Sequence, residues 1–240
     1  MTLWKRWKRR WRNLERSGPV RLVKRRFRQL TGGELRHFVQ VRVPRVTYGG
    51  WTVSPNRLRA GSVVYSFGVG EDVAFEQALI ERHDVEVHAF DPTPLSVAWA
   101  ESRQWPRGFH FHAYGVAHYD GVARFNPPVN PKNSYTMLER STTAHAAIEG
   151  RVYRLPTILQ MLGHARIDVL KLDIEGMEYA VIDELLAESI AVDQLLVEFH
   201  HRWRSVGRAK TERAVDLLEK RGYRIFAISA AGWEYSFIAR

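Results

Sequence analysis

The chain has 240 residues, of which 45% are hydrophobic and 12% aromatic, and it contains no cysteine. This composition is that of a globular protein that can bury one sizeable core, and it excludes disulfides, thiolate nucleophiles and cysteine-ligated zinc. No apolar run approaches the ~20 residues that span a bilayer, and the N-terminus lacks the apolar core of a secretory signal. We therefore expect a cytoplasmic protein.

The net charge of +10 is concentrated at the N-terminus. Residues 1–30 hold twelve Lys or Arg and one acid, Glu15, which leaves a charge of −1 on the remaining 210 residues. We expect two parts: a basic, Trp-rich helical extension in residues 1–35 and a nearly neutral domain in residues 36–240.

Apolar residues in the extension recur at helical spacing among the cations. The first stripe is Trp4, Trp7, Trp11 and Leu14, and the second, after a Ser17-Gly18-Pro19 break, is Val20, Val23, Phe27 and Leu30. Amphipathic helices that carry tryptophan and many cations lie in membrane interfaces, and each cation near an anionic surface adds ~1 kcal/mol. We predict peripheral binding to an anionic membrane through residues 1–30.

Three other interpretations stay open for this segment. The helices could pack on the domain or on a second subunit, the basic run could bind nucleic acid, or the segment could be a cleaved transit peptide. We expect packing more than nucleic-acid binding or targeting. For a transit peptide, the segment is poor in Ser and unusually rich in Trp.

The domain reads as strands that alternate with helices. A weak strand is expected at 37–46, a loop at 126–145, and a closing pair of strands at 223–228 and 234–238. The other expected strands are 63–67, 85–90, 109–113, 123–125, 167–172 and 194–199, and the helices are 73–82, 95–103, 155–162, 178–186 and 208–220.

This order predicts a doubly wound α/β fold whose sheet is mostly parallel, with one antiparallel edge strand from the terminal hairpin. Ligands of such sheets gather at the carboxyl ends of the strands. The charged candidates all fall at those ends.

A cofactor site is indicated between the first two strands of the alternating region. Gly68 and Gly70 allow a tight turn against a ligand, and Asp91 lies 21 residues past Gly70, close to the ~20-residue interval of a ribose-binding carboxylate. The alternative that involves no cofactor is an ordinary turn between a strand and a helix, with Asp72 as the N-cap of that helix.

The acids in the turn favour one kind of cofactor. Val73 stands where a dinucleotide fingerprint has its third glycine, and Glu71 and Asp72 would repel a pyrophosphate. They suit an ammonium or sulfonium group, so we predict S-adenosyl-L-methionine. A nicotinamide-dependent oxidoreductase is the alternative from another enzyme class.

Four segments resemble the FkbM-type S-adenosylmethionine-dependent methyltransferases between about Val63 and Trp203. They are residues 65–72, 89–94, 167–178 and 195–200. The most specific part is the Leu170-Lys171-Leu172-Asp173-Ile174-Glu175-Gly176 element of the third segment. The resemblance implies a class I (Rossmann-like) methyltransferase fold that acts on hydroxyl groups of glycans or polyketides. It does not cover the N-terminal 35 residues.

The resemblance also implies roles for single residues. Gly68 and Gly70, with Phe67 before them, would line the methionine end of the cofactor, Glu71 or Asp72 would meet its ammonium group, and Asp91 would accept the ribose hydroxyls. Gly115 would edge the adenine. Asp173 and Glu175 would face the methyl group and the acceptor, or else cap the following helix.

The reaction needs an aligned acceptor oxygen and a group that takes its proton. His200 is the first candidate for that base and Asp173 the second, since histidine titrates near neutrality. His201 is expected to be a solvated neighbour. Asp173, Glu175, Glu198 and His200 could converge on magnesium, but sequence spacing cannot show this and we assign no metal ligands.

We therefore predict a methyltransferase that moves a methyl group from S-adenosylmethionine to a hydroxyl of a glycan, a lipid-linked sugar or a secondary metabolite. The alternatives are the oxidoreductase and a non-catalytic methyltransferase-like module that tethers a membrane or RNA partner.

Overall fold

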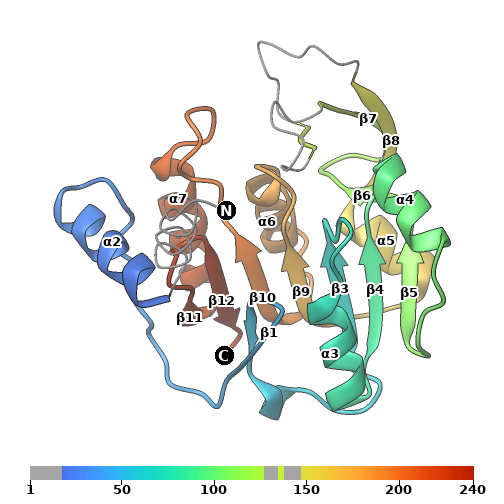
Figure 1. Cartoon of the computed structure of the whole chain (residues 1–240), viewed down its shortest axis with the longest axis horizontal. Coiled ribbons are helices and arrows are strands. Elements are labelled where there is room, and N and C mark those ends of the chain that lie inside the picture. The colour runs from blue at the N-terminus through green and yellow to red at the C-terminus, as the bar shows by residue number, and fades with distance from the viewer. Residues whose placement is uncertain (1–17, 127–134, 138–146) are drawn as a thin grey trace, which may run out of the picture.

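A computed structural model describes residues 18–126, 135–137 and 147–240. Its centre is a seven-stranded sheet in the order β11-β12-β10-β9-β3-β4-β5 (Figure 1). The strands in chain order are β3 (Val63–Phe67), β4 (Glu86–Phe90), β5 (Phe109–His112), β9 (Ile167–Leu172), β10 (Val192–Glu198), β11 (Arg224–Ile228) and β12 (Glu234–Ile238).

The sheet is mostly parallel, as expected. Strands β3, β4, β5, β9 and β10 pair in parallel, and β12 pairs antiparallel with both β10 and β11. The antiparallel strand lies one position in from the edge, because the second strand of the terminal hairpin inserts between β10 and β11.

Helices cover both faces of the sheet. On one face, α5 (Leu155–Leu162), α6 (Glu178–Ala187) and α7 (Arg208–Lys220) bury their apolar sides against the strands. On the other face lie α3 (Ala74–His83), the short hairpin of β1 (Val46–Tyr48) and β2 (Trp51–Val53), and Trp99 of α4 (Pro94–Glu101). The result is a three-layer α/β domain in which the loops at the strand ends are free to form a site.

The expected strand at residues 37–46 is wrong. Gln40 and Val41 donate hydrogen bonds to the carbonyl of Ile225, but the segment has no ladder, and the regular pairing begins with β1 at Val46. The alternation there is weak and the flanking turn is short, so the sequence pattern placed the strand too early.

A second, three-stranded sheet has the order β6-β8-β7 and stands beside α4 and α5 in Figure 1. It consists of β6 (Gly115–Val116), β8 (Ile148–Tyr153) and β7 (Gly121–Phe125). The sequence predicted part of β7 and missed the other two strands, because β6 has two residues and β8 carries Glu149, Gly150 and Arg151 in its middle.

The second stripe of the basic extension forms α2 (Gly18–Leu30), beside the hairpin end of the sheet (Figure 1). Its buried residues are Arg25 and Gln29, whereas Val23, Phe27 and Leu30 are 66–80% exposed. The helix therefore docks through its polar side and turns its apolar stripe outward. The first stripe, from Trp4 to Leu14, lies outside the described residues.

None of the helices among the described residues has the length and apolar character that crossing a membrane requires. Most of the expected loop at 126–145 also lies outside the described residues. Of its described part, Asn126 bridges to Thr136, whose hydroxyl donates to the carbonyl of Glu175 at 2.7 Å.

Candidate active site

The carboxyl ends of four adjacent parallel strands bring the expected site residues to one edge of the sheet. The turn at 68–70 follows β3, Asp91 follows β4, residues 173–175 follow β9, and β10 ends at Glu198, two residues before His200. Because β3 lies between β4 and β9 in the sheet, the glycine turn is the centre of this edge.

The glycine turn touches the strand end that carries the expected catalytic acid. Gly68 has a φ of +75°, and a Cβ atom there would lie 1.8 Å from the carbonyl oxygen of Asp173. The amide of Asp173 donates to the carbonyl of Phe67 at 3.2 Å. Both the backbone angle and the close approach therefore require glycine at position 68.

Gly70 has a different surrounding. Its φ is +56°, and a Cβ atom there would meet nothing within 4 Å. Its amide donates to Oδ2 of Asp91 at 3.0 Å, which joins the tips of β3 and β4. A side chain at position 70 would extend into the open space beside the turn, which we call the cradle.

Asp91 is 6% exposed and fixed by its neighbours. Its Oδ1 accepts hydrogen bonds from the amide and the hydroxyl of Thr93, at 2.9 Å and 2.6 Å. Among the described residues, Oδ2 accepts one hydrogen bond, from the amide of Gly70, and a carboxylate oxygen can accept two. The remaining acceptor position could receive a ribose hydroxyl at the strand tip.

Other residues expected to hold the cofactor differ in exposure. Glu71 and Asp72 are exposed in the turn, and Oδ1 of Asp72 accepts the amide of Ala74 at 3.0 Å, so Asp72 also fixes the start of α3. The ring of Phe67 is fully buried and stacked on Phe90, with centroids 4.3 Å apart. Only the main chain of Phe67 can border a cofactor.

Gly115, expected at the adenine edge, is buried in β6. A Cβ atom there would contact Pro92 at 3.4 Å and Val152 at 3.5 Å. Gly115 therefore packs on the residue after Asp91, and its contact with adenine stays a prediction.

Asp173, Glu175 and His200 converge at the ends of β9 and β10. Single ligand atoms from the three side chains all lie within 4.8 Å of one another. Nε2 of His200 lies 3.3 Å from Oε2 of Glu175 and 4.0 Å from Oε1 of Glu198. This convergence is what the sequence could not show.

A fourth carboxylate, which sequence reasoning missed, orients the histidine. Nδ1 of His200 donates to Oε1 of Glu178 at 2.6 Å, and that oxygen also accepts the amide of Gly176 at 3.0 Å. Glu178 is fully buried at the first turn of α6. The sequence did carry a signal for this role of Glu178. An acid stands on the buried side of the helix that directly follows the Asp173–Gly176 turn.

The environment changes the protonation of the cluster. Burial alone would lower the pKa of His200, but the hydrogen bond to Glu178 and the charges of Glu178, Glu175 and Glu198 outweigh it and raise the pKa to about 9. Burial raises the pKa of Asp173 to about 6, against the lowering charges of Lys171 and His200. At neutral pH, His200 therefore carries a proton and Asp173 is mostly ionised.

The three converging side chains offer the donor atoms that a divalent cation prefers. A protonated His200 would supply positive charge to the same carboxylates.

His201 is not the solvated neighbour that we expected. It is 2% exposed, and its Nε2 donates to Oε1 of Glu34 at 2.6 Å. The backbone turns into a loop after β10, and the segment that follows α2 covers that loop, so His201 is buried under residues that are distant in sequence.

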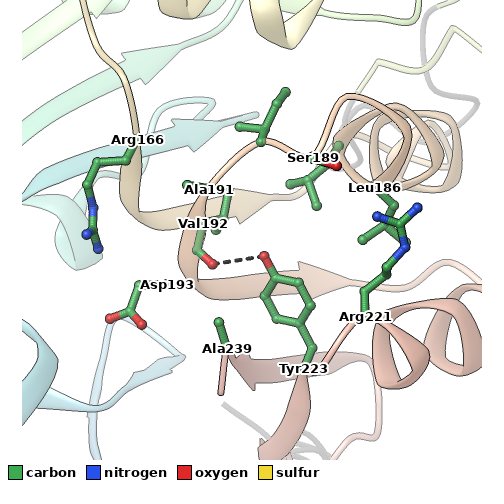
Figure 2. Close-up of a pocket in the computed structure, with 11 residues that line it drawn as sticks. Arg166, Leu186, Ser189, Ala191, Val192, Asp193, Arg221, Tyr223 and Ala239 are labelled. Carbon is green, nitrogen blue, oxygen red and sulfur yellow. Dashed lines mark hydrogen bonds between the residues drawn. The ribbon is translucent and has the colours of Figure 1, made fainter.

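A pocket of about 360 Å³ lies at the opposite edge of the sheet. Figure 2 shows Arg166, Asp193 and Ala239 around it, and the hydroxyl of Tyr223 donates to the carbonyl of Val192 at 2.8 Å. These residues surround the amino ends of β9 and β10. The pocket is therefore remote from the glycine turn and is no part of the candidate active site.

The sheet order, the antiparallel β12 and a glycine turn followed by an acid at the next strand tip define a class I methyltransferase. The model of a family described as "Methyltransferase domain" matches residues 35–237. The chain belongs to that methyltransferase family, and the predicted cofactor, S-adenosylmethionine, agrees with it. The FkbM-type resemblance is narrower than this family match, and it stays a prediction.

Two curated relatives carry the name "Probable methyltransferase-like protein 24". The chain is 28% identical over 173 residues to the protein of Rattus norvegicus, an alignment that covers 68% of this chain and 42% of the relative. It is 29% identical over 146 residues to the protein of Homo sapiens, covering 58% and 33%. The alignments thus span less than half the length of these relatives.

Solved structures resemble the chain at low sequence identity. Fibrillarin from Aeropyrum pernix, in complex with S-adenosyl-L-methionine, has a TM-score of 0.45 and 9% identity, and the match covers 77% of this chain and 68% of fibrillarin. An rRNA methylase from Streptococcus thermophilus has a TM-score of 0.44 and 11% identity, covering 77% and 91%.

Proposed function

We propose that this protein is an FkbM-type O-methyltransferase that moves the methyl group of S-adenosylmethionine to a hydroxyl of a glycan, a lipid-linked sugar or a secondary metabolite. The observation that carries the proposal is the contact between the two halves of the site. Gly68 of the cofactor turn lies against the carbonyl of Asp173, whose strand end carries the proton-handling cluster.

The cofactor would be held by groups around the cradle. The turn at Gly68 and Gly70 would border its methionine end, Glu71 would meet its ammonium group, and Oδ2 of Asp91 would accept a ribose hydroxyl. When bound, S-adenosylmethionine supplies a methyl group that is already activated by its sulfonium. The protein has to orient the acceptor and take a proton from it.

Asp173 is the better proton acceptor in this cluster. It is mostly ionised at neutral pH and lies next to the cofactor turn, whereas the raised pKa of His200 keeps that ring protonated. Asp173 therefore replaces His200, which was the first candidate for the base from the sequence. His200, held through Nδ1 by Glu178, would instead keep a positive charge beside the carboxylates.

The sequence left two alternative functions open, an oxidoreductase and a non-catalytic module. The methyltransferase family match argues against a nicotinamide-dependent oxidoreductase. A non-catalytic module remains distinguishable by experiment, because it would show no methyl transfer and would lose nothing in its role when Asp91 is replaced by Ala.

The peripheral membrane part of the proposal is supported by the orientation of α2. Val23, Phe27 and Leu30 point away from the domain and are flanked by exposed Arg26 and Arg28. We expect full-length protein to sediment with anionic vesicles at low salt, and replacement of Phe27 and Leu30 by Ser to reduce that binding. Equal binding by the two proteins would contradict the membrane role.

The test of the activity is a transfer screen with labelled S-adenosylmethionine over extracted glycolipids, glycans and secondary metabolites. The wild type is compared with the Asp173→Asn variant. General-base catalysis contributes typically 10²–10⁴-fold, so we expect at least a hundredfold loss of transfer with cofactor binding retained. Label found on nitrogen or carbon would overturn the hydroxyl assignment.

A further inference from the structure

A second pocket, of about 230 Å³, lies between α2 and the ends of β10 and β12. Helix α2 lines it with residues one turn apart, which share a helix face. These residues are all basic: Arg21, Lys24, Arg25 and Arg28. The side of α2 that faces the domain is therefore a row of positive charges.

Arg25 shows that this row is built into the fold. It is 9% exposed, and its terminal nitrogens donate to the carbonyls of Ser229 and His37, each at 3.3 Å. Its Nε is buried and makes no hydrogen bond of good geometry within the described residues. Gly232 admits the side chain, since a Cβ atom there would lie 2.9 Å from Cδ of Arg25.

The far wall of the pocket adds a cation and an indole. Arg202 lies over the ring of Trp233, 4.9 Å from its centroid, and is tied to the buried Glu34. Trp233 is 39% exposed. This wall is rigid, because Arg202 also donates to the carbonyl of Ala231 at 2.7 Å.

Two acids line the pocket, Glu198 and Glu234, so that five basic side chains face two carboxyl groups. The hydroxyl of Ser229 donates to Glu234. Burial and the charge of Asp173 raise the pKa of Glu198 to about 8, so Glu198 is mostly protonated at neutral pH. Basic side chains therefore outnumber the carboxyl groups in the lining of the pocket.

Glu198 also joins this pocket to the catalytic cluster. Its Oε1 lies 4.0 Å from Nε2 of His200, and its side chain is 19% exposed. A molecule that occupies the pocket and extends past Glu198 thus reaches the end of β10, where Asp173 and Glu175 converge with His200.

We propose that this pocket binds a phosphate or diphosphate group of the acceptor and so directs a neighbouring hydroxyl to the cluster at Asp173 and His200. Guanidinium groups bind phosphate oxygens through paired N–H donors. The volume is below the roughly 300–1,000 Å³ of a pocket for a whole drug-sized ligand, so it suits one charged group of a larger molecule. The inference rests on the proposed function.

Two sources could supply such a phosphate. One is a soluble phosphorylated sugar, and the other is the headgroup of a membrane lipid or lipid-linked sugar, which the outward Val23, Phe27 and Leu30 of the same helix would bring near. The chemistry at the pocket is the same for both, so the experiment needs one arm for each.

The test is calorimetry of the full chain with inorganic pyrophosphate. The variant Arg21→Gln/Arg28→Gln removes two exposed pocket cations. The matched control Arg26→Gln/Arg42→Gln removes two exposed cations that do not line the pocket. We expect the pocket variant to bind pyrophosphate at least tenfold more weakly and the control to bind within twofold of the wild type.

A second arm uses vesicles of phosphatidylcholine with phosphatidylglycerol. Release of bound wild-type protein by pyrophosphate would identify the lipid phosphate as the source, and vesicle binding that pyrophosphate does not disturb would identify a soluble one. No saturable binding of pyrophosphate, or equal weakening by both double variants, overturns the proposal.

Binding of S-adenosylhomocysteine to the same proteins separates the two proposals. We expect all of them to bind it equally, because none of the changed residues lies at the cradle. Pyrophosphate binding without S-adenosylhomocysteine binding would remove the proposed function and leave the anion pocket, and the reverse result would remove the pocket alone.

Discussion

Nε2 of His201 donates a 2.6 Å hydrogen bond to Oε1 of Glu34, although the two residues are 167 positions apart. Nε of Arg202 donates to the other oxygen of Glu34 at 2.9 Å. The link fastens the segment after α2 to the loop that follows β10. Through it, the basic helix and the candidate active site keep one relative position.

We first predict that Glu34→Gln destabilises the protein. Burial alone would raise the pKa of Glu34, but hydrogen bonds from His201 and Arg202 lower it from 4.5 to about 2. A lowered carboxyl pKa stabilises the fold above the unfolded value, and this contribution is lost as pH falls through 4.5 towards 2. The shift corresponds to about 3 kcal/mol, which urea denaturation at pH 7 would measure.

A matched control for this change is Asp216→Asn, which breaks the exposed ion pair with Lys220. Exposed pairs of this kind contribute roughly 0–1 kcal/mol. Equal unfolding midpoints for the Glu34 and Asp216 variants would show that the link to His201 does not stabilise the fold.

Replacing Asp91 with Ala should weaken binding of S-adenosylhomocysteine. Loss of the one hydrogen bond that the remaining acceptor position of this charged group can offer costs about 1.5–3 kcal/mol, and calorimetry measures the change directly. Asp183→Ala, on the partly exposed outer side of α6, is the control. A melting curve must accompany the measurement, since Asp91 also accepts the amides of Gly70 and Thr93. Unchanged affinity would take Asp91 out of the site.

The two glycines of the turn should respond differently to Ala. At Gly70, the methyl group enters open space, so Gly70→Ala costs about 1 kcal/mol for its positive φ and blocks the cradle. At Gly68, the methyl group collides with the carbonyl of Asp173, so Gly68→Ala should lower the melting temperature strongly. A Gly70→Ala protein that binds S-adenosylhomocysteine as the wild type does would show that the cradle is not the cofactor site.

Methyl transfer should follow a bell-shaped pH profile. Activity rises as Asp173, with a pKa of about 6, ionises, and it falls as His200, with a pKa of about 9, loses its proton. The two limbs are macroscopic values of the coupled cluster. His200→Gln should remove the alkaline limb from a plot of kcat/KM against pH. A single rise that continues to pH 9 and above would instead make neutral His200 the base.

Chelation should leave the activity unchanged. The protonated ring of His200 supplies the positive charge near Glu175 and Glu178 that a metal would otherwise supply. Assays with and without EDTA, followed by addition of magnesium, measure this. Loss of activity that magnesium restores would make Asp173, Glu175 and His200 metal ligands.

Local patterns in the sequence were enough for the alternating elements. Val63–Phe67, Leu155–Leu162, Ile167–Leu172, Arg208–Lys220 and Glu234–Ile238 have the predicted bounds. These segments are continuous apolar strands or amphipathic helices between turn residues, so their hydrophobic period sets their structure. Once they alternate, a parallel sheet brings the residues after each strand to one edge.

The surroundings of the side chains in the site could be known only from the tertiary structure. The sequence named His200 as a base from the usual pKa of histidine, but three carboxylates from α6 and the ends of β9 and β10 surround that ring. The pairing of β8 with β6 and β7 also depends on partners far away in the chain, because Gly150 packs against Pro92 and Phe125.

The basic extension shows most clearly which features the sequence determines and which features depend on the tertiary structure. The sequence by itself determined an amphipathic helix at Gly18–Leu30, because its apolar residues recur at helical spacing. Only the tertiary structure decided which side of that helix faces the domain. Arg25 and Gln29 find carbonyl partners at Ser229 and Leu35, and hydrogen bonds of that kind between distant segments cannot be read from local periodicity.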